Sequence, residues 1–338
     1  MMKTSKLLTI GLSIIGVGVF MSGCGAAEQA DTSSDNSHTE ETIKVVTTFY
    51  PMYDFTKNVA QDLAEVSLLL PAGTEVHDFE PSAKDVAEIQ EADVFIYNSE
   101  EMETWVPSVL DTIDSTEVLV IDASEGITLI ENEAVEEHND SDHEHAEHTH
   151  DHDEEGQEEQ EEHSHAIDPH IWLDPVLAQE EVNTIKEGLI EADPENEEGY
   201  EVNADAYNQK LEALDQEYRG AFQEAENRTF VTQHAAFAYL AQQYDLNQVS
   251  IAGLSSEEEP SPAKLAELSE LVDQEGMEYI YFEDNSSSKI AETLASEVGV
   301  ELALLSPLEG VSQADQDAGV DYIEVMKNNL ESLKKSIR

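Results

Sequence analysis

The chain has 338 residues, enough for two domains of ordinary size, and 40% of them are hydrophobic, which suffices for packed cores. It carries 76 acidic against 15 basic side chains, a formal net charge of -61. Because phosphate binding requires clustered Lys and Arg, this balance argues against nucleic acid as a partner. It favours cations, which a negative field concentrates, although salt adaptation would also produce an acidic surface.

The first segment, 1–23, has the pattern of a secretion signal. Two lysines precede an uncharged apolar stretch, 7–21, that is short for a membrane span. Cys24 follows as the only cysteine, so no intramolecular disulfide can form. The four residues that end at Cys24 resemble the lipobox of bacterial lipoproteins, except that Met21 replaces the usual leucine. We therefore expect lipidation of Cys24 to anchor the protein to the extracellular face of the cell membrane, with 24–42 as a flexible tether.

Beyond the tether, short apolar runs alternate with longer amphipathic segments, a pattern typical of α/β proteins with parallel sheets. Helices are expected after most of the strands, for example at 82–91 and 262–274. The expected strands are 43–48, 66–70, 93–97, 117–121, 229–232, 248–251, 278–282 and 300–304.

Eight such units could close a single barrel, but two features favour two lobes. Residues 194–225 read as one helix, about twice the length of a typical one. The segment 80–89 resembles 259–268, and each contains a serine placed to cap a helix. We therefore predict an N-terminal lobe at 43–193 and a similar C-terminal lobe at 226–338, joined by the helix.

One segment of the N-terminal lobe, 131–165, stands outside this pattern. It holds eight of the twelve histidines, and its first 32 positions contain sixteen acidic residues and no Lys or Arg. Such a segment has almost no apolar content and cannot fold by burial. We expect a disordered, solvent-exposed loop.

Outside the tether and this loop only three histidines remain: His77, His170 and His234. His77 and His234 each follow an expected strand, and His170 lies between two prolines and before a helix. Ligand sites in open α/β sheets form beyond the carboxyl ends of strands, so three histidines on both sides of a candidate cleft indicate a shared site. Three imidazoles plus one carboxylate suit tetrahedral Zn²⁺.

The chain resembles the metal-binding solute-binding proteins of ABC transporters, of the zinc-specific ZnuA/AdcA type. The matching stretches, which run from Val45 to near the C-terminus, include 48–51, 77–82, 168–175, 234–240, 259–262 and 306–310. The resemblance implies two Rossmann-like lobes with parallel sheets joined by a long rigid α-helix, and a metal site in the cleft between the lobes. It also implies His77, His170 and His234 as ligands. Manganese members usually carry a carboxylate where this chain has His234, and a histidine-rich acidic loop before the second ligand is typical of zinc members.

The fourth ligand is expected to be a carboxylate of the C-terminal lobe. Glu283 and Glu309 both follow expected strands there. Glu309 lies in a loop that Pro307 stiffens, and it matches the position at which zinc members with a carboxylate ligand carry it. We predict Glu309, and Glu283 and water remain the alternatives.

The resemblance implies a monomeric receptor, and not an enzyme, that captures Zn²⁺ with high affinity and delivers it to an ABC transporter permease. A manganese receptor and a zinc-dependent adhesin of the same fold are the nearest alternatives. A zinc hydrolase is a third, although no acid–base group for it can be identified. Copper would bind such a nitrogen-rich site at least as well as zinc.

Overall fold

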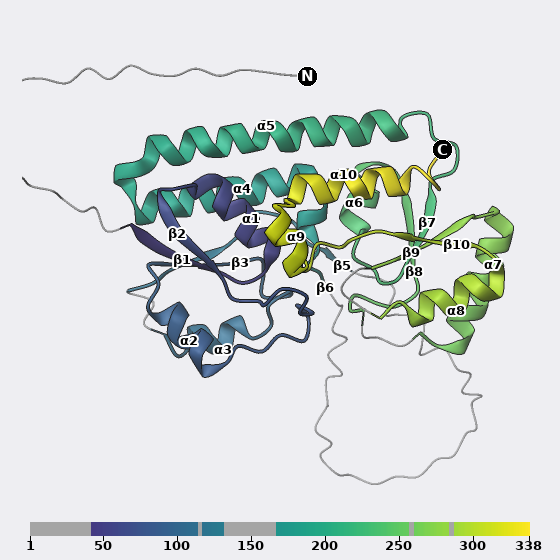
Figure 1. Ribbon diagram of the computed structural model, residues 1–338, viewed down its shortest axis with the longest axis horizontal. Coiled ribbons are helices and arrows are strands. Elements are labelled where there is room, and N and C mark those ends of the chain that lie inside the picture. Colours follow the sequence, from purple (N-terminus) through teal and green to yellow (C-terminus); the bar gives the residue numbers. More distant parts are fainter. Residues whose placement is uncertain (1–41, 114–116, 132–166, 257–259, 284–286) are drawn as a thin grey trace, which may run out of the picture. The chain divides into compact units, whose positions relative to one another are not determined.

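The computed structural model describes 42–338 except for four gaps, at 114–116, 132–166, 257–259 and 284–286 (Figure 1). The predicted signal, Cys24, the tether and nearly all of the histidine-rich loop therefore lie outside the described residues. Thr42–Arg338 form one compact unit. Within the described part, no helix is long and apolar enough to cross a membrane.

The first sheet is parallel and has the strand order β2-β1-β3-β4. Its central strand β3 is buried at all four positions, as expected for a parallel sheet covered on both faces. The strands are β1 (Ile43–Thr47), β2 (Ala64–Leu68), β3 (Val94–Tyr97) and β4 (Leu119–Asp122), and the helices between them are α1 (Tyr50–Ala60), α2 (Ala83–Gln90) and α3 (Val106–Leu110).

The second sheet is also parallel and has the order β10-β9-β7-β8, so its four strands follow the same relative order as those of the first sheet. The strands are β7 (Thr229–Thr232), β8 (Asn247–Ser250), β9 (Tyr279–Phe282) and β10 (Glu301–Leu304), and the helices between them are α6 (Ala238–Gln243), α7 (Pro262–Glu275) and α8 (Lys289–Val298). All eight predicted strands are present, each within two residues of its predicted bounds.

The predicted sequence repeat corresponds to a structural repeat. Ser82 and Ser261 are the N-caps of α2 and α7, and each accepts a hydrogen bond from the backbone N–H three residues later. Both caps were expected from the sequence, because a serine oxygen can satisfy a donor that the first helical turn leaves unpaired.

The chain between the sheets contains a short hairpin and two long helices. Strands β5 (Ile130–Glu131) and β6 (Ile167–Asp168) pair antiparallel on either side of 132–166. This hairpin was not predicted, because two-residue strands carry no periodic signal. It is followed by the 3₁₀ helices η2 (Ile171–Leu173) and η3 (Pro194–Asn196), and by α4 (Pro175–Ala192) and α5 (Glu197–Phe222).

Helix α5 is the long helix predicted at 194–225, shortened at its start by the 3₁₀ turn. It contacts α1, α4 and the last long helix, α10 (Tyr322–Leu333), which follows α9 (Gln313–Ala318) (Figure 1). The Tyr207 hydroxyl donates to Asp54 in α1 at 2.7 Å, and the Tyr218 hydroxyl donates to the Met326 carbonyl in α10 at 2.7 Å. Its predicted apolar face is buried, with Tyr200, Tyr207, Leu211, Leu214, Tyr218 and Phe222 all at most 2% exposed.

Candidate metal centre

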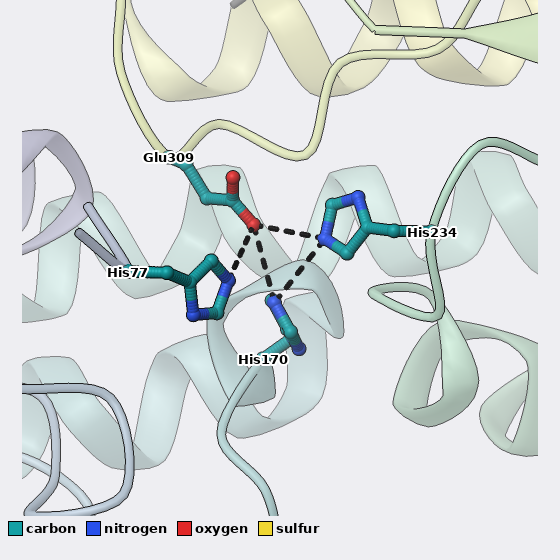
Figure 2. Close-up of side chains that lie close together, drawn as sticks. All are labelled: His77, His170, His234 and Glu309. Atoms are coloured by element: carbon teal, nitrogen blue, oxygen red, sulfur yellow. Dashed lines mark hydrogen bonds and ion pairs between the residues drawn. The ribbon is translucent and has the colours of Figure 1, made fainter. Parts of the chain in front are cut away.

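Four side chains from separate segments meet at one point of the molecule (Figure 2). His77 comes from the loop after β2, His170 directly precedes η2, His234 follows β7, and Glu309 follows β10. One ligand atom from each lies within 4.8 Å of the other three. The structure therefore brings together the three histidines and the carboxylate that the sequence nominated.

One carboxylate oxygen lies at the middle of the group. Oε1 of Glu309 is 3.0 Å from Nε2 of His234, 3.1 Å from Nε2 of His170 and 3.4 Å from Nε2 of His77. Nε2 of His170 and Nε2 of His234 are 3.4 Å apart. The side chains of His170, His234 and Glu309 are at most 1% exposed, whereas that of His77 is 13% exposed.

These spacings fit a tetrahedral zinc ion. Metal bonds of about 2.0 Å in a tetrahedron place the ligand atoms about 3.3 Å apart, close to the four distances above. Nε2 of His77 is buried and makes no hydrogen bond, although Glu309 lies 3.4 Å away. A buried nitrogen without a hydrogen-bond partner is costly unless it binds something else, and a metal ion at the centre of the group would remove that cost.

Two further carboxylates contact Nδ1 of two of the imidazoles, on the side of each ring away from Glu309. Oδ1 of Asp168 lies 2.7 Å from Nδ1 of His170, and Oε1 of Glu283 lies 2.6 Å from Nδ1 of His234. Each of these oxygens also accepts the backbone N–H of its own histidine, at 3.0 Å in both cases. An Nδ1–H that donates to a carboxylate leaves Nε2 as the lone-pair nitrogen, so both rings present the atom that a metal requires.

Neighbouring segments hold the His170 backbone in place. The Asn98 side chain, just after β3, donates to the carbonyl of Pro169 at 3.0 Å. The Tyr239 hydroxyl in α6 donates to the carbonyl of Asp168 at 2.6 Å. The buried turn before η2 is thus tied both to the first sheet and to the second half of the chain.

The clustered side chains shift one another's pKa values. Burial disfavours charge on His170 and His234, yet the adjacent carboxylates outweigh it and raise the pKa of both imidazoles, that of His234 well above the ordinary value. Burial likewise acts to raise the pKa of Glu309, but the three histidines hold that pKa well below its usual range. Both shifts favour the charged forms, an ionised Glu309 beside imidazoles that hold protons more strongly, and a cation that binds there must compete with those protons.

A fourth acidic side chain, that of Glu75, lies beside this group. The Ser256 hydroxyl donates to Oε2 of Glu75 at 3.1 Å. Burial, together with the charge of Glu309 and a hydrogen bond with it, raises the pKa of Glu75 to about 8. These causes favour the neutral form of the Glu75 carboxyl.

Sequence reasoning missed the orienting role of Asp168 and considered Glu283 only as a direct ligand. Asp168 stands two residues before His170, close enough for its side chain to accept both N–H groups of that histidine. That spacing was a usable signal. For Glu283 the only signal was its place at the end of a strand, which it shares with Glu309.

Comparison with known proteins gives a consistent result. The family model described as "Zinc-uptake complex component A periplasmic" matches residues 45–336. The chain is 48% identical over 322 residues to the high-affinity zinc uptake system protein ZnuA of Bacillus subtilis, which covers 94% of each chain. It is 45% identical to the zinc-binding lipoprotein AdcA of Streptococcus pneumoniae, covering 99% of this chain but 61% of AdcA.

A solved structure is similar as well. The Zn(II)-bound ZnuA-like domain of Streptococcus pneumoniae AdcA matches with a TM-score of 0.71 and 44% identity, covering 88% of this chain and 99% of that one. The family-model match, residues 45–336, includes strands of both sheets of the present fold.

Proposed function

The chain belongs to the zinc-uptake complex component A family, and from this we infer that it is an extracellular receptor that captures Zn²⁺ and delivers it to an ABC-type uptake permease. Zinc is its cargo. Such a protein must bind the ion tightly enough to collect it and release it to a partner, and it carries out no chemistry on it.

The observation that carries this proposal is the convergence of three imidazole nitrogens on one carboxylate oxygen. We assign His77, His170, His234 and Glu309 as the zinc ligands. The support is the set of distances between 3.0 and 3.4 Å, the burial of three of the four side chains, and the orienting carboxylates behind two rings.

The donor set also favours zinc over manganese. Manganese prefers oxygen-rich octahedral sites, whereas three imidazoles and one carboxylate oxygen match tetrahedral zinc. The negative oxygen offsets part of the ion's charge within a buried site. His234 is decisive, because a carboxylate at that position would add an oxygen ligand and a second negative charge.

The fourth coordination position separates a receptor from a hydrolase. A catalytic zinc site keeps this position open for water, and a second group must then transfer the proton. Here the carboxylate of Glu309 lies where that water would bind, within 3.0–3.4 Å of all three imidazoles. A closed shell of protein ligands supports binding and not catalysis.

The proposed ligands come from both halves of the described chain. His77 and His170 belong to the proposed N-terminal lobe, 43–193, and His234 and Glu309 to the proposed C-terminal lobe, 226–338. Helix 194–225 would connect them as a stiff support. We propose that zinc leaves when these two pairs of ligands separate, because neither pair alone completes the coordination shell.

We further propose that the mature protein is a monomer tethered to the membrane by a lipid at Cys24. The support is the lipobox-like sequence after the apolar segment. Replacing Cys24 by Ala should move the protein from the membrane fraction to the medium. The change removes the proposed site of lipid attachment, and without its acyl chains the protein has no proposed anchor. A Cys24→Ala variant that stays in the membrane fraction would contradict this part of the proposal.

The test of the function combines metal binding with uptake. The mature chain, purified without added metal, is titrated with zinc against a chromogenic chelator. We expect one tight zinc per molecule, lost in His170→Ala and retained in the matched variant His138→Ala of the histidine-rich loop. Cells that lack the protein should take up zinc slowly at low external zinc, and only the wild type and His138→Ala should restore uptake. No tight zinc in the wild type, or normal uptake without it, would disprove the assignment.

A further inference from the structure

Trp172 connects the segment that carries His170 to the loop that carries Glu309. Its side chain is completely buried, and its indole Nε1–H donates to the carbonyl oxygen of Pro307 at 2.8 Å. The indole ring also packs against the His170 ring, with centroids 5.2 Å apart. One side chain thus contacts one metal-binding residue directly and reaches the backbone two residues before another.

The loop that Trp172 holds has a backbone conformation that is unfavourable for its residue. Leu308, between Pro307 and Glu309, has φ +59°, in the left-handed region that side chains other than glycine rarely adopt. Leu308 is also completely buried. A strained residue of this kind persists only where surrounding contacts over-determine it. The contacts that hold this loop are therefore of functional interest.

Contacts from two other segments hold this loop, one from α10 and one from Trp172. Asn329 of α10 accepts the backbone N–H of Ser306 at 2.9 Å and donates to the Ser306 carbonyl at 2.7 Å. The next residue, Pro307, is held from the other half of the chain by Trp172. Trp172 is itself fixed, because its carbonyl accepts the Tyr322 hydroxyl at 2.7 Å.

These contacts hold the backbone just before Glu309, whose side chain reaches the histidines. Only Oε1 approaches all three imidazoles (Figure 2). Metal–ligand distances in protein sites vary by only about 0.2 Å, so a small displacement of the loop would take Oε1 out of bonding range. Pro307 has no N–H of its own, and its carbonyl is the nearest backbone group before Glu309 that another segment holds.

We propose that Trp172 is the positioning residue for the fourth zinc ligand, and that its indole N–H sets the place of Glu309 relative to His170. This rests on the proposed assignment of Glu309 as a ligand. Trp172 thereby fixes the spacing between His170 and Glu309, two proposed ligands from different halves of the chain. Loss of the N–H frees the loop and lets water take the place of the carboxylate.

The chain provides a matched control. Trp105, the other of its two tryptophans, is also buried, at 8% exposure, and packs against Phe79 and Phe95. Its Nε1 makes no hydrogen bond. Trp105→Phe therefore removes a buried indole N–H that holds no other segment, whereas Trp172→Phe removes the hydrogen bond to Pro307 and keeps an aromatic ring next to His170.

The experiment measures zinc affinity by chelator competition and the visible absorption of the Co²⁺-loaded mature protein, whose bands report the ligand set. Trp172→Phe should weaken zinc binding about tenfold, the lower range for residues that orient ligands, and Trp105→Phe should leave it unchanged. The Co²⁺ spectrum of Trp172→Phe should move toward that of Glu309→Gln. In the Glu309→Gln background Trp172→Phe should have no further effect, because the two changes act through one ligand.

An equal loss of affinity with and without Glu309 would overturn the proposal, since Trp172 would then act only as a core residue. A Glu309→Gln variant with the affinity and spectrum of the wild type would overturn the ligand assignment and the proposal with it. If Trp172→Phe fails to fold, replacement of Trp172 by 3-benzothienylalanine keeps the two-ring shape and removes only the N–H. The same spectral shift is expected there, and an unshifted spectrum would overturn the proposal.

Discussion

Glu283 offers a sharp test of the carboxylates that contact the proposed metal ligands. Its Oε1 accepts both Nδ1–H and the backbone N–H of His234, at 2.6 and 3.0 Å, and its side chain is 3% exposed. Glu283→Gln replaces the carboxylate by an amide of the same shape. The amide oxygen can still accept both hydrogen bonds, so the change removes mainly the negative charge. Glu283→Ala removes the orientation of the ring as well.

The expected magnitudes follow from this difference. Loss of a group that orients a metal-bound histidine typically lowers metal affinity by about 10- to 100-fold, or about 1.4–2.7 kcal/mol. We expect Glu283→Gln near tenfold, because the geometry survives, and Glu283→Ala near a hundredfold. His234→Ala should lose more than either, since it removes the ligand itself.

The pH dependence adds a second signature. Burial opposes a proton on His234, but Glu283 and Glu309 raise its pKa well above the ordinary value in the metal-free protein. Without the charge of Glu283 that pKa falls, so protons compete less with zinc in the variant than in the wild type. The affinity difference between the two should therefore narrow as the pH is lowered from 7.5 to 6.

The orienting role of Glu283 is tested by measuring zinc affinity at both pH values through chelator competition. Glu297→Gln, on the exposed face of α8, is the control for lost surface charge. Wild-type affinity in Glu283→Gln would refute the orienting role. A loss as large as that of His234→Ala, with the Co²⁺ spectrum of Glu309→Gln, would identify Glu283 as the direct ligand and Glu309 as the wrong choice.

Three further predictions concern pH, the core and the histidine-rich loop. As the pH is lowered, the zinc affinity of the wild type should begin to fall while the pH is still above about 6.5, the ordinary histidine pKa, because carboxylates raise the pKa values of buried His170 and His234. Titration calorimetry from pH 8 to 5.5 should record the protons that are released when zinc binds. Glu181 in α4 is fully buried with neither carboxyl oxygen hydrogen-bonded, and burial raises its pKa well above the ordinary value. Its contribution to stability is therefore greatest below its unfolded pKa of about 4.5 and is lost as pH rises, so Glu181→Leu should raise the free energy of unfolding by about 1–3 kcal/mol at pH 7.5 and by less at pH 4.5 in urea titrations. Deleting 131–165 should remove weakly bound zinc and keep one tight zinc per molecule in equilibrium dialysis, because a flexible chain must be ordered at each binding event; loss of the tight ion would contradict this.

The position of a residue after a strand was not enough to choose the proposed fourth ligand, Glu309, over Glu283. Glu283 and Glu309 follow neighbouring strands, β9 and β10, and strand ends alone do not distinguish them. The structure separates them through the chain after each strand. Glu283 comes directly after β9 and accepts the Nδ1–H and the backbone N–H of His234. The strained turn at Leu308 instead carries Glu309 to the Nε2 atoms of all three histidines.

The strands, the buried face of α5 and the helix caps could be predicted from the sequence, because each depends on residues close together in the chain. Apolar periodicity located all eight strands of the two sheets and the buried face of α5, and serine at a helix start predicted the caps of α2 and α7. The histidines could be nominated because strand ends determine where side chains leave a parallel sheet. What only the tertiary structure decided are relations between distant segments: the pairing of β5 with β6, the place of Asp168 and Glu283 behind the imidazoles, and the contact between Trp172 and Pro307. These depend on loop conformation and on packing across the molecule, which no pattern within a short window of sequence records.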